Sequence, residues 1–110
     1  MIKVCLCGST KFKEEFAEAA KAETLDGNIV LTVGFFGHAD GVELPRKVKA
    51  KLDALHMMKI LEADEVLVVD IDGYIGESTE REIEFALLLE RPIRYWREDQ
   101  EKRAFMRGEE

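Results

Sequence analysis

The segment 65–71 contains an apolar run with no polar residue between its members, Val66-Leu67-Val68-Val69. A strand with one face in water alternates apolar and polar side chains, whereas a strand covered on both faces is apolar throughout. Strands of the second kind occur mainly in parallel sheets that are covered by helices. This run therefore predicts a parallel sheet with helices on both of its faces.

The rest of the chain alternates short apolar runs with amphipathic stretches. Strands are predicted at 2–7, 28–33, 65–71 and 92–96. A first helix is predicted before Asp26, with Phe12, Phe16, Ala19 and Ala20 as its apolar stripe. Further helices are predicted at 45–62 and 78–90, with a short one in the charged tail 97–110. Ser9 or Thr10 would cap the first helix at its N-terminus, and Asp26-Gly27 would end it.

This alternation of strands and helices predicts an α/β fold with three layers in a single domain, residues 1–110. Right-handed crossovers and a first strand in the middle of the sheet give a flavodoxin-like strand order, 2-1-3-4, with four strands or five. Ligands of such folds bind beyond the carboxyl ends of the strands. Three loops with unusual chemistry are predicted at that edge: 7–11, 34–41 and 70–79.

The charge and the length of the apolar runs exclude several kinds of partner. Sixteen basic and 23 acidic residues give a net charge of −7. This disfavours binding to a nucleic acid duplex, which requires many phosphates to be neutralised by Lys and Arg. No apolar run approaches the roughly 20 residues of a membrane span, and the N-terminus lacks the apolar segment of a signal peptide. We therefore expect a cytoplasmic protein that binds neither membrane nor duplex.

Cys5 and Cys7 are the only two cysteines and lie two residues apart in the first strand. Side chains at this spacing share one face of the strand but form no disulfide without distorting it. We interpret both as small, reduced core residues of an intracellular protein, in preference to a zinc site built with His38 and His56. No metal ligand and no cofactor is assigned.

The first loop, Gly8-Ser9-Thr10-Lys11, joins a strand to the N-terminus of a helix. Free backbone N–H groups and the positive end of the helix dipole favour an anion at such a place, and the three polar side chains add donors. The loop lacks the glycines and the Lys-Ser/Thr pair of a Walker A motif. It predicts either a small anion site or an ordinary capped turn.

Glu82 is the unusual residue of the helix predicted at 78–90. On a helical wheel it falls among Thr79, Ile83 and Ala86, on the side opposite the charged residues. Because a buried, unpaired carboxylate is costly, we predict that Glu82 faces the ligand crevice. The helix N-terminus would keep it ionised there, as a nucleophile or base. The alternatives are a carboxylate paired with Lys or Arg, or one that binds free N–H groups at the helix end.

These residues resemble a known family. A strand with an Asp is followed by a glycine loop, then by a Ser or Thr, and then by Glu82 and Ala86. This order of residues is similar to the motif of the nucleoside 2-deoxyribosyltransferase superfamily. That superfamily includes the 2′-deoxynucleoside 5′-phosphate N-hydrolases. Cys7-Gly8-Ser9 after the first strand and Ala63-Asp64 before the third are also similar. The resemblance covers most of residues 2–96.

The resemblance implies that Glu82 is the nucleophile of a retaining mechanism. Glu82 would attack the anomeric carbon of a ribose or deoxyribose, the base would leave, and water or a second base would resolve the glycosyl-enzyme. In the hydrolase branch a GSxR-like first loop holds the 5′-phosphate, and Gly8, Ser9 and Lys11 match it, with Lys in place of Arg. The resemblance also implies that phosphate or sugar is bound by Gly76, Ser78 and Thr79.

Several roles stay open at this point. The acid that protonates the leaving base is one of His56, Asp72, Asp53 and His38, and His56 and Asp72 are taken as catalytic candidates. Phe36 and His38 are expected to form a platform for the nucleobase, whereas Phe35 is interpreted as hydrophobic packing. Members of the family complete their sites with a neighbouring subunit. The helix predicted at 45–62 is apolar on two sides, so we expect a homodimer or a larger homo-oligomer.

The leading hypothesis is cleavage or transfer of the N-glycosidic bond of a nucleoside or a nucleoside 5′-monophosphate. A phosphoribohydrolase of the cytokinin-activating type has a similar loop, but this chain lacks its double glycine. A non-catalytic nucleotide-binding or sensing domain on the same scaffold is the alternative from another class. A receiver-type signalling domain would need an acidic pair after the first strand, where Cys7-Gly8-Ser9 stands instead.

Overall fold

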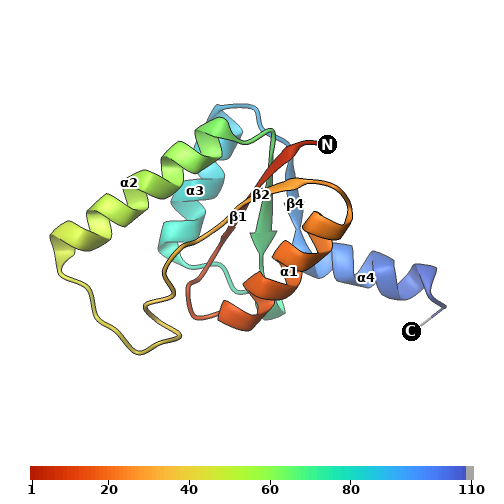
Figure 1. Cartoon of the computed structure of the whole chain (residues 1–110), viewed down its shortest axis with the longest axis horizontal. Coiled ribbons are helices and arrows are strands. Elements are labelled where there is room, and N and C mark those ends of the chain that lie inside the picture. Colours follow the sequence, from red (N-terminus) through yellow and green to blue (C-terminus); the bar gives the residue numbers. More distant parts are fainter. Residues whose placement is uncertain (109–110) are drawn as a thin grey trace.

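A computed structural model describes residues 1–108 of the chain (Figure 1). The strands are β1 (Lys3–Gly8), β2 (Ile29–Leu31), β3 (Glu65–Val69) and β4 (Ile93–Tyr95). The helices are α1 (Lys13–Leu25), α2 (Arg46–Glu62), α3 (Glu77–Leu88) and α4 (Trp96–Met106), with a short 3₁₀ turn, η1 (Ile71–Gly73), after β3. None of the helices within residues 1–108 is long and apolar enough to cross a membrane.

The four strands form one parallel sheet in the order β2-β1-β3-β4. The longest register lies at its centre, where β1 and β3 pair from Val4↔Glu65 to Gly8↔Val69. This confirms the predicted α/β class, the parallel sheet and the 2-1-3-4 order. Within residues 1–108 the sheet has four strands, and the segment after β4 forms the helix α4 rather than a fifth strand.

Helices cover both faces of the sheet, so the domain has three layers (Figure 1). Successive residues of β1 point to opposite faces. Val4 and Leu6 pack with residues of α1 and α4, such as Phe16 and Trp96. The other face of β1 packs against α2 and α3, and it presents Cys5 and Cys7. These four residues of β1 are fully buried, so the apolar pattern at the centre of the sheet is explained by cover on both sides.

The start of α1 differs from the prediction. The helix begins at Lys13, its N-cap residue is Phe12, and no side chain caps it. Ser9 and Thr10 belong instead to a turn in which the Phe12 N–H donates to the Ser9 carbonyl oxygen at 3.1 Å. The Ser9 hydroxyl accepts a bond from the Lys11 N–H at 3.3 Å. A Ser or Thr hydroxyl can accept a backbone N–H in a turn as well as at a helix end. Here the Ser9 hydroxyl does so in a turn, and the first loop is therefore longer than predicted.

Candidate active site

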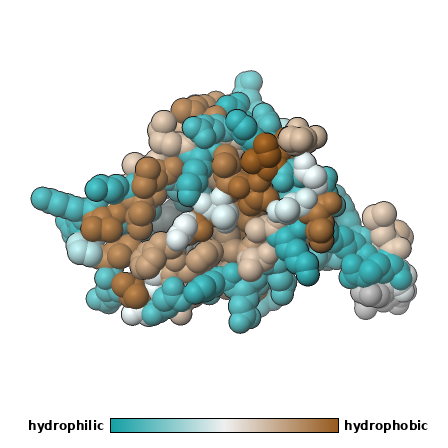
Figure 2. All heavy atoms as spheres, viewed as in Figure 1, coloured by the Kyte–Doolittle hydropathy of each residue, from teal (hydrophilic) through white to brown (hydrophobic). Residues whose placement is uncertain are grey.

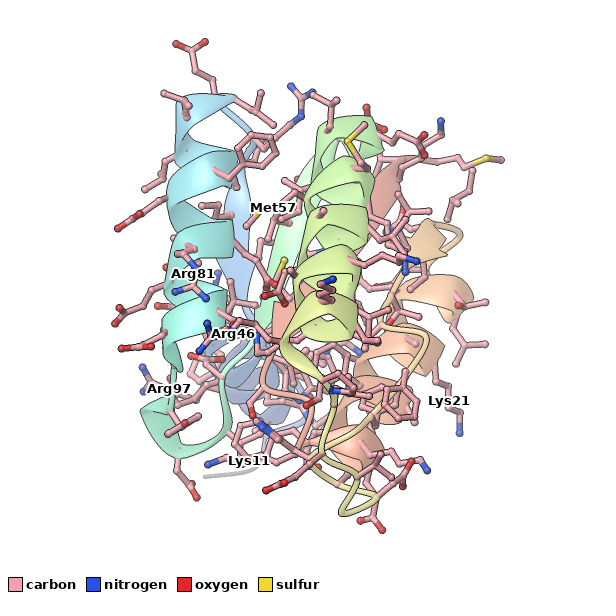
Figure 3. The ribbon with its side chains drawn as sticks, turned by 90° about the vertical axis from the view of Figure 1, so that its left-hand side faces the viewer. Lys11, Lys21, Arg46, Met57, Arg81 and Arg97 are labelled. Atoms are coloured by element: carbon pink, nitrogen blue, oxygen red, sulfur yellow. The ribbon has the colours of Figure 1, made fainter. Side chains whose placement is uncertain are left out.

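A pocket of about 920 Å³ lies at the carboxyl edge of the sheet. Its walls come from the end of β1 and the following turn (8–10), the loop between β2 and α2 (33–44), residues 49–59 of α2, and the segment 74–82. The three loops that were expected at this edge therefore meet around one cavity, and α2 closes its side. Figure 3 shows α2 and α3 next to each other, with Lys11 towards the end of the molecule where the loops gather.

Glu82 lies in the wall of this pocket, on the buried side of α3. The buried residues of that helix are Thr79, Glu82 and Ala86, spaced by three and four residues as on one face of a helix. Glu82 is 8% exposed. Its Oε1 is buried and has no hydrogen-bond partner among the residues that the structure describes. The position predicted from the wheel is therefore confirmed, and the carboxylate is neither locked to a Lys or Arg nor bonded to the helix end through this oxygen.

His56 of α2 lies beside Glu82, with 3.9 Å between its Nε2 and the Glu82 Oε1. Burial raises the pKa of Glu82 to about 7, and the positive charge of His56 opposes this rise. Burial acts to lower the pKa of His56. The hydrogen bond with Cys5 and the charge of Glu82 outweigh that effect, so the His56 pKa lies above its ordinary value. Glu82 therefore titrates near neutral pH beside a histidine whose protonated form is favoured, which suits a site for acid, base or nucleophilic chemistry.

Cys5 and Cys7 lie behind this pair. Their Sγ atoms are 3.7 Å and 3.5 Å from the His56 Nε2. The hydrogen bond from Cys7 lowers the pKa of the Cys5 thiol to about 6, against the effect of burial, and His56 adds to the lowering. The pKa of Cys7 is raised, because the bond to Cys5 and burial favour its protonated form. Both cysteines are fully buried and free, and neither lines the pocket, so a substrate in the pocket would not reach either sulfur.

The cysteines are reduced core residues, as the sequence suggested, but they are also part of a polar cluster. Cys5, Cys7 and His56 each offer a donor atom, and the three atoms lie within 4.8 Å of one another. His38 is exposed, lines the pocket wall and is not part of this group. In the sequence, the association of the cysteines with His56 was considered only as part of a zinc site with His38, the less favoured alternative to core packing.

Ser78 lies between two basic side chains at the N-terminus of α3. Its hydroxyl is 3.3 Å from the Lys49 Nζ and 3.2 Å from the Arg81 Nη2. Lys49 lines the pocket and also forms an ion pair with Asp53 at 2.9 Å. Although the chain is acidic overall, this corner combines two cations, a hydroxyl and a helix N-terminus, which is an arrangement that favours an anion.

Most of the other predicted binding residues line the same pocket. Gly8 and Ser9 contribute from the end of β1, His38 from the loop before α2, and three residues from the start of α3: Gly76, Ser78 and Thr79. Of the open candidates for the general acid, Asp53, His38 and His56 line the pocket. Asp72 is exposed, adopts a left-handed conformation (φ 53°) in η1, and is absent from the pocket wall.

Two predicted positions lie elsewhere. The Lys11 Nζ lies 3.5 Å from the centroid of the Tyr74 ring, a cation–π contact, and Lys11 does not line the pocket. The Phe36 ring packs edge-on against Phe16 in the core, with ring centroids 5.4 Å apart, whereas Phe35 is 37% exposed and lines the pocket. Phe36 was expected in the pocket and Phe35 in the core, so the two positions are the reverse of the prediction. An irregular loop has no periodic pattern of side chains that would indicate which of its residues is buried.

Lys49 and Lys59 line the pocket and were not singled out in the sequence. The signal was weak because α2 has lysines at several positions (47, 49, 51 and 59) and no pattern distinguishes the two that line the cavity. The Lys59 Nζ donates to the Thr32 carbonyl oxygen at 2.6 Å, so this cation ties α2 to the end of β2. Lys49 is the one of the pair placed beside the hydroxyl of Ser78.

Searches against models of known protein families, against curated proteins and against solved structures find no match to this chain. The fold and the pocket are therefore interpreted from their own geometry.

Proposed function

We propose that the protein cleaves the N-glycosidic bond of a nucleoside 5′-monophosphate by a retaining mechanism, with Glu82 as the nucleophile. The observation that supports this most is a buried carboxylate whose Oε1 has no hydrogen-bond partner among residues 1–108, in the wall of a nucleotide-sized pocket. The resemblance to the nucleoside 2-deoxyribosyltransferase superfamily points to the same residue. Transfer of the sugar to a second base is the variant of this reaction in which the acceptor is not water.

In the first step a lone pair of the ionised Glu82 carboxylate attacks the anomeric carbon. The C–N bond breaks, its electron pair leaves with the base, and the base takes a proton from an acid of the pocket. In the second step the acid, now deprotonated, takes a proton from water, the water oxygen bonds to the anomeric carbon, and the bond to Glu82 breaks to release the carboxylate. His56, next to Glu82, is placed to stabilise the carboxylate as a positioning residue.

Since His56 is assigned to positioning Glu82, two other pocket groups remain as the acid for the leaving base, His38 and Asp53. Asp72 is not proposed, because it is exposed and lies outside the pocket wall. His38→Ala and Asp53→Asn separate the two, since loss of the acid lowers the rate most for substrates whose base is the poorest leaving group.

The phosphate of the substrate is proposed to bind beside Ser78 and Lys49, with Ser9 on the opposite loop. Lys49 takes the place that the sequence had suggested for Lys11, because it lines the pocket and contacts the Ser78 hydroxyl. Phe35, which is 37% exposed and lines the pocket, is proposed to stack on the base. The phosphate assignment favours a nucleotide over a free nucleoside, whereas stacking on the base is the same for both.

The protein is also proposed to form a homodimer through α2. Leu55, Met58 and Leu61 of this helix are 52%, 56% and 42% exposed. Figure 2 shows hydrophobic atoms gathered over the side of the molecule where α2 and the loop before it lie. Large apolar side chains on a helix next to a pocket are suited to a second subunit that completes the site. Sedimentation velocity of wild type and Leu55→Asp tests this, with a dimer expected only for the former.

The test of the reaction is the release of free base from a panel of ribo- and deoxyribonucleosides and their 5′-monophosphates, followed by chromatography. We expect release by wild type, loss of at least about 1,000-fold in Glu82→Gln because the nucleophile is removed, and near wild-type rates in Glu84→Gln. Glu84 is on the same helix and lies in its exposed part. Nucleotide binding without any base release would contradict the enzyme and support a sensing domain.

A further inference from the structure

Four potential metal ligands converge where β1, α2 and α3 meet. Cys5 and Cys7 come from β1, His56 from α2 and Glu82 from α3. The two cysteines are 0% exposed, and His56 and Glu82 are each 8% exposed. Cysteine thiolates, imidazole and carboxylate are the ligand types of protein zinc sites. The cluster is thus chemically of the kind that binds a thiophilic divalent cation.

The separations between the donor atoms agree with tetrahedral coordination. With Zn–S of about 2.3 Å and Zn–N of about 2.0–2.1 Å, the sulfur and nitrogen atoms of a tetrahedral site lie about 3.6 Å apart. The Sγ atoms of Cys5 and Cys7 are 3.7 Å and 3.5 Å from the His56 Nε2. All three donor atoms fall within 4.8 Å of one another. Small side-chain movements would therefore suffice to close the three atoms around one ion.

Glu82 provides an independent observation. Its side chain is nine-tenths buried and its Oε1 lies 3.9 Å from the His56 Nε2, without a hydrogen-bond partner in the described part of the chain. A buried polar atom without a partner is costly. A cation bound to the two sulfurs and the imidazole would give this oxygen a partner and complete four-fold coordination.

We propose that Cys5, Cys7, His56 and Glu82 form a binding site for a thiophilic divalent cation, of which Zn²⁺ is the chemical type. The ion reaches the site through the pocket, because His56 and Glu82 line its wall and the cysteines lie behind them. The ion binds two thiolates, the neutral ring of His56 and the Glu82 carboxylate, so every proton that these four groups carry beyond those forms is released to solvent. In the metal-bound form, the lone pair of Glu82 is coordinated to the cation.

The proposed metal site does not depend on whether the protein is a glycosidase. The metal-site proposal and the glycosidase proposal can therefore be contradicted independently. If Glu82 is also the nucleophile, the metal-bound protein cannot attack a sugar, so Zn²⁺ inhibits base release and a chelator restores it. Base release that is indifferent to Zn²⁺, in protein shown to bind the ion, would mean that Glu82 is not both ligand and nucleophile. Metal binding itself is measured without any substrate.

The experiment titrates the reduced, chelator-treated protein with Co²⁺ and then displaces the Co²⁺ with Zn²⁺. We expect saturation at one equivalent, visible bands typical of tetrahedral Co²⁺, and a near-ultraviolet thiolate-to-cobalt charge-transfer band. Because this measurement uses the wild-type chain, it does not depend on how a variant folds. Absence of the charge-transfer band, including weak binding of Co²⁺ through oxygen or nitrogen alone, would overturn the proposal.

Variants then test which residues bind the ion, by competition for Zn²⁺ with a chromophoric chelator. Cys7→Ala and His56→Ala are expected to lose more than about 100-fold in affinity, since removal of a direct ligand costs more than removal of a group that only supports one. His38→Ala is the matched control for the histidine and is expected to retain wild-type affinity, as His38 lies outside the cluster. Circular dichroism confirms that each variant is folded. Equal losses in His38→Ala and His56→Ala would contradict the assignment.

Discussion

At the scale of single residues, the chemistry of the site depends on where Glu82 is buried. Its side chain lies on the face of α3 that packs towards β1 and α2, so desolvation raises its pKa to about 7. The neighbouring His56 partly offsets this effect by favouring the ionised carboxylate. The result is a carboxyl group that titrates close to neutral pH, which is the range in which a nucleophile or a base is useful.

The pH dependence of base release follows from this pKa. A retaining nucleophile must be ionised, and the pKa of Glu82 is raised to about 7, so the rate is expected to fall as the pH decreases below about 7. In metal-free buffer with a chelator, the logarithm of kcat/KM should decrease by one for each pH unit on that limb. A rate that stays constant from pH 7 down to pH 5 would show that the reacting group has an ordinary carboxyl pKa.

The pKa of Glu82 also has a consequence for folding. Its pKa in the folded protein lies above the ordinary value of 4.5, so between about pH 4.5 and 7 the folded chain binds more protons than the unfolded chain. Stability therefore falls as the pH rises through this window. We expect the difference in unfolding free energy between Glu82→Gln and wild type to shift in favour of the variant from pH 5 to pH 8, measured in urea with a chelator present. A difference that does not change with pH would contradict this.

The position of the phosphate is tested by two lysines. Lys49→Ala should weaken the affinity for a nucleoside 5′-monophosphate by about 10-fold or more, the usual cost of losing a bond to a charged group, and should leave the nucleoside nearly unaffected. Lys11→Ala should change neither strongly, because Lys11 lies over the Tyr74 ring. The control is Lys51→Ala, because Lys51 is an exposed lysine of α2, the helix that also carries Lys49. Titration calorimetry measures all three, and equal losses for nucleotide and nucleoside in Lys49→Ala would place the phosphate elsewhere.

At the scale of elements, regular periodicity decided what the sequence could predict. The helical wheel located Glu82 on the buried face of α3, and the apolar runs located the strands and their order. The contact of His56 with Cys5 and Cys7 joins residues 51 and 49 positions apart, and it depends on how α2 lies against β1. No local pattern contains that information. The roles of Phe35 and Phe36, and of Lys11 and Lys49, were missed for a similar reason, since loops and lysine-rich helices have no period that marks the side facing a cavity.

Gly8 at the end of β1 allows the close approach of β3 that shapes the pocket edge. A Cβ at this position would lie 2.9 Å from the Val69 carbonyl oxygen and 3.2 Å from the Phe16 ring, and the backbone has φ +156°. Gly8→Ala is therefore expected to lower the unfolding free energy by about 1–3 kcal/mol, as for other overpacked positions. Gly34→Ala, where a Cβ would meet nothing within 4 Å, is the control. An unfolding temperature of Gly8→Ala equal to that of wild type would show that β1 and β3 can move apart at this point without loss of stability.

At the scale of the whole molecule, Arg94 of β4 links elements that are far apart in the chain. It forms ion pairs with Glu23 of α1, Glu65 of β3 and Asp99 of α4. The Glu23 side chain is 1% exposed, so it depends on Arg94 for its charge balance. This network lies on the α1 and α4 side of the sheet and is separate from the pocket, whose wall includes none of these residues.

Arg94→Ala should destabilise the fold by about 3–5 kcal/mol, because removal of one partner leaves a buried charge unpaired. Lys13→Ala, which breaks an exposed ion pair with Asp40, should cost no more than about 1 kcal/mol. The double variant Arg94→Leu with Glu23→Leu is expected to lose less than Arg94→Ala, since the buried Glu23 charge is removed together with its partner, although Glu65 and Asp99 still lose theirs. Urea denaturation measures each. Similar costs for Arg94→Ala and Lys13→Ala would contradict the assigned role of the network.

The most direct measurement of the central claim is to trap the sugar on Glu82. A 2′-deoxy-2′-fluoro nucleoside 5′-monophosphate slows both steps, because fluorine destabilises the positive charge that develops on the sugar ring, and a slow second step leaves the glycosyl-enzyme to accumulate. We predict that peptide mass spectrometry of the chelator-treated protein finds a fluoro-sugar phosphate on Glu82, and finds none in Glu82→Gln. An unmodified Glu82 in protein that releases base, or an adduct on another residue, would contradict the account.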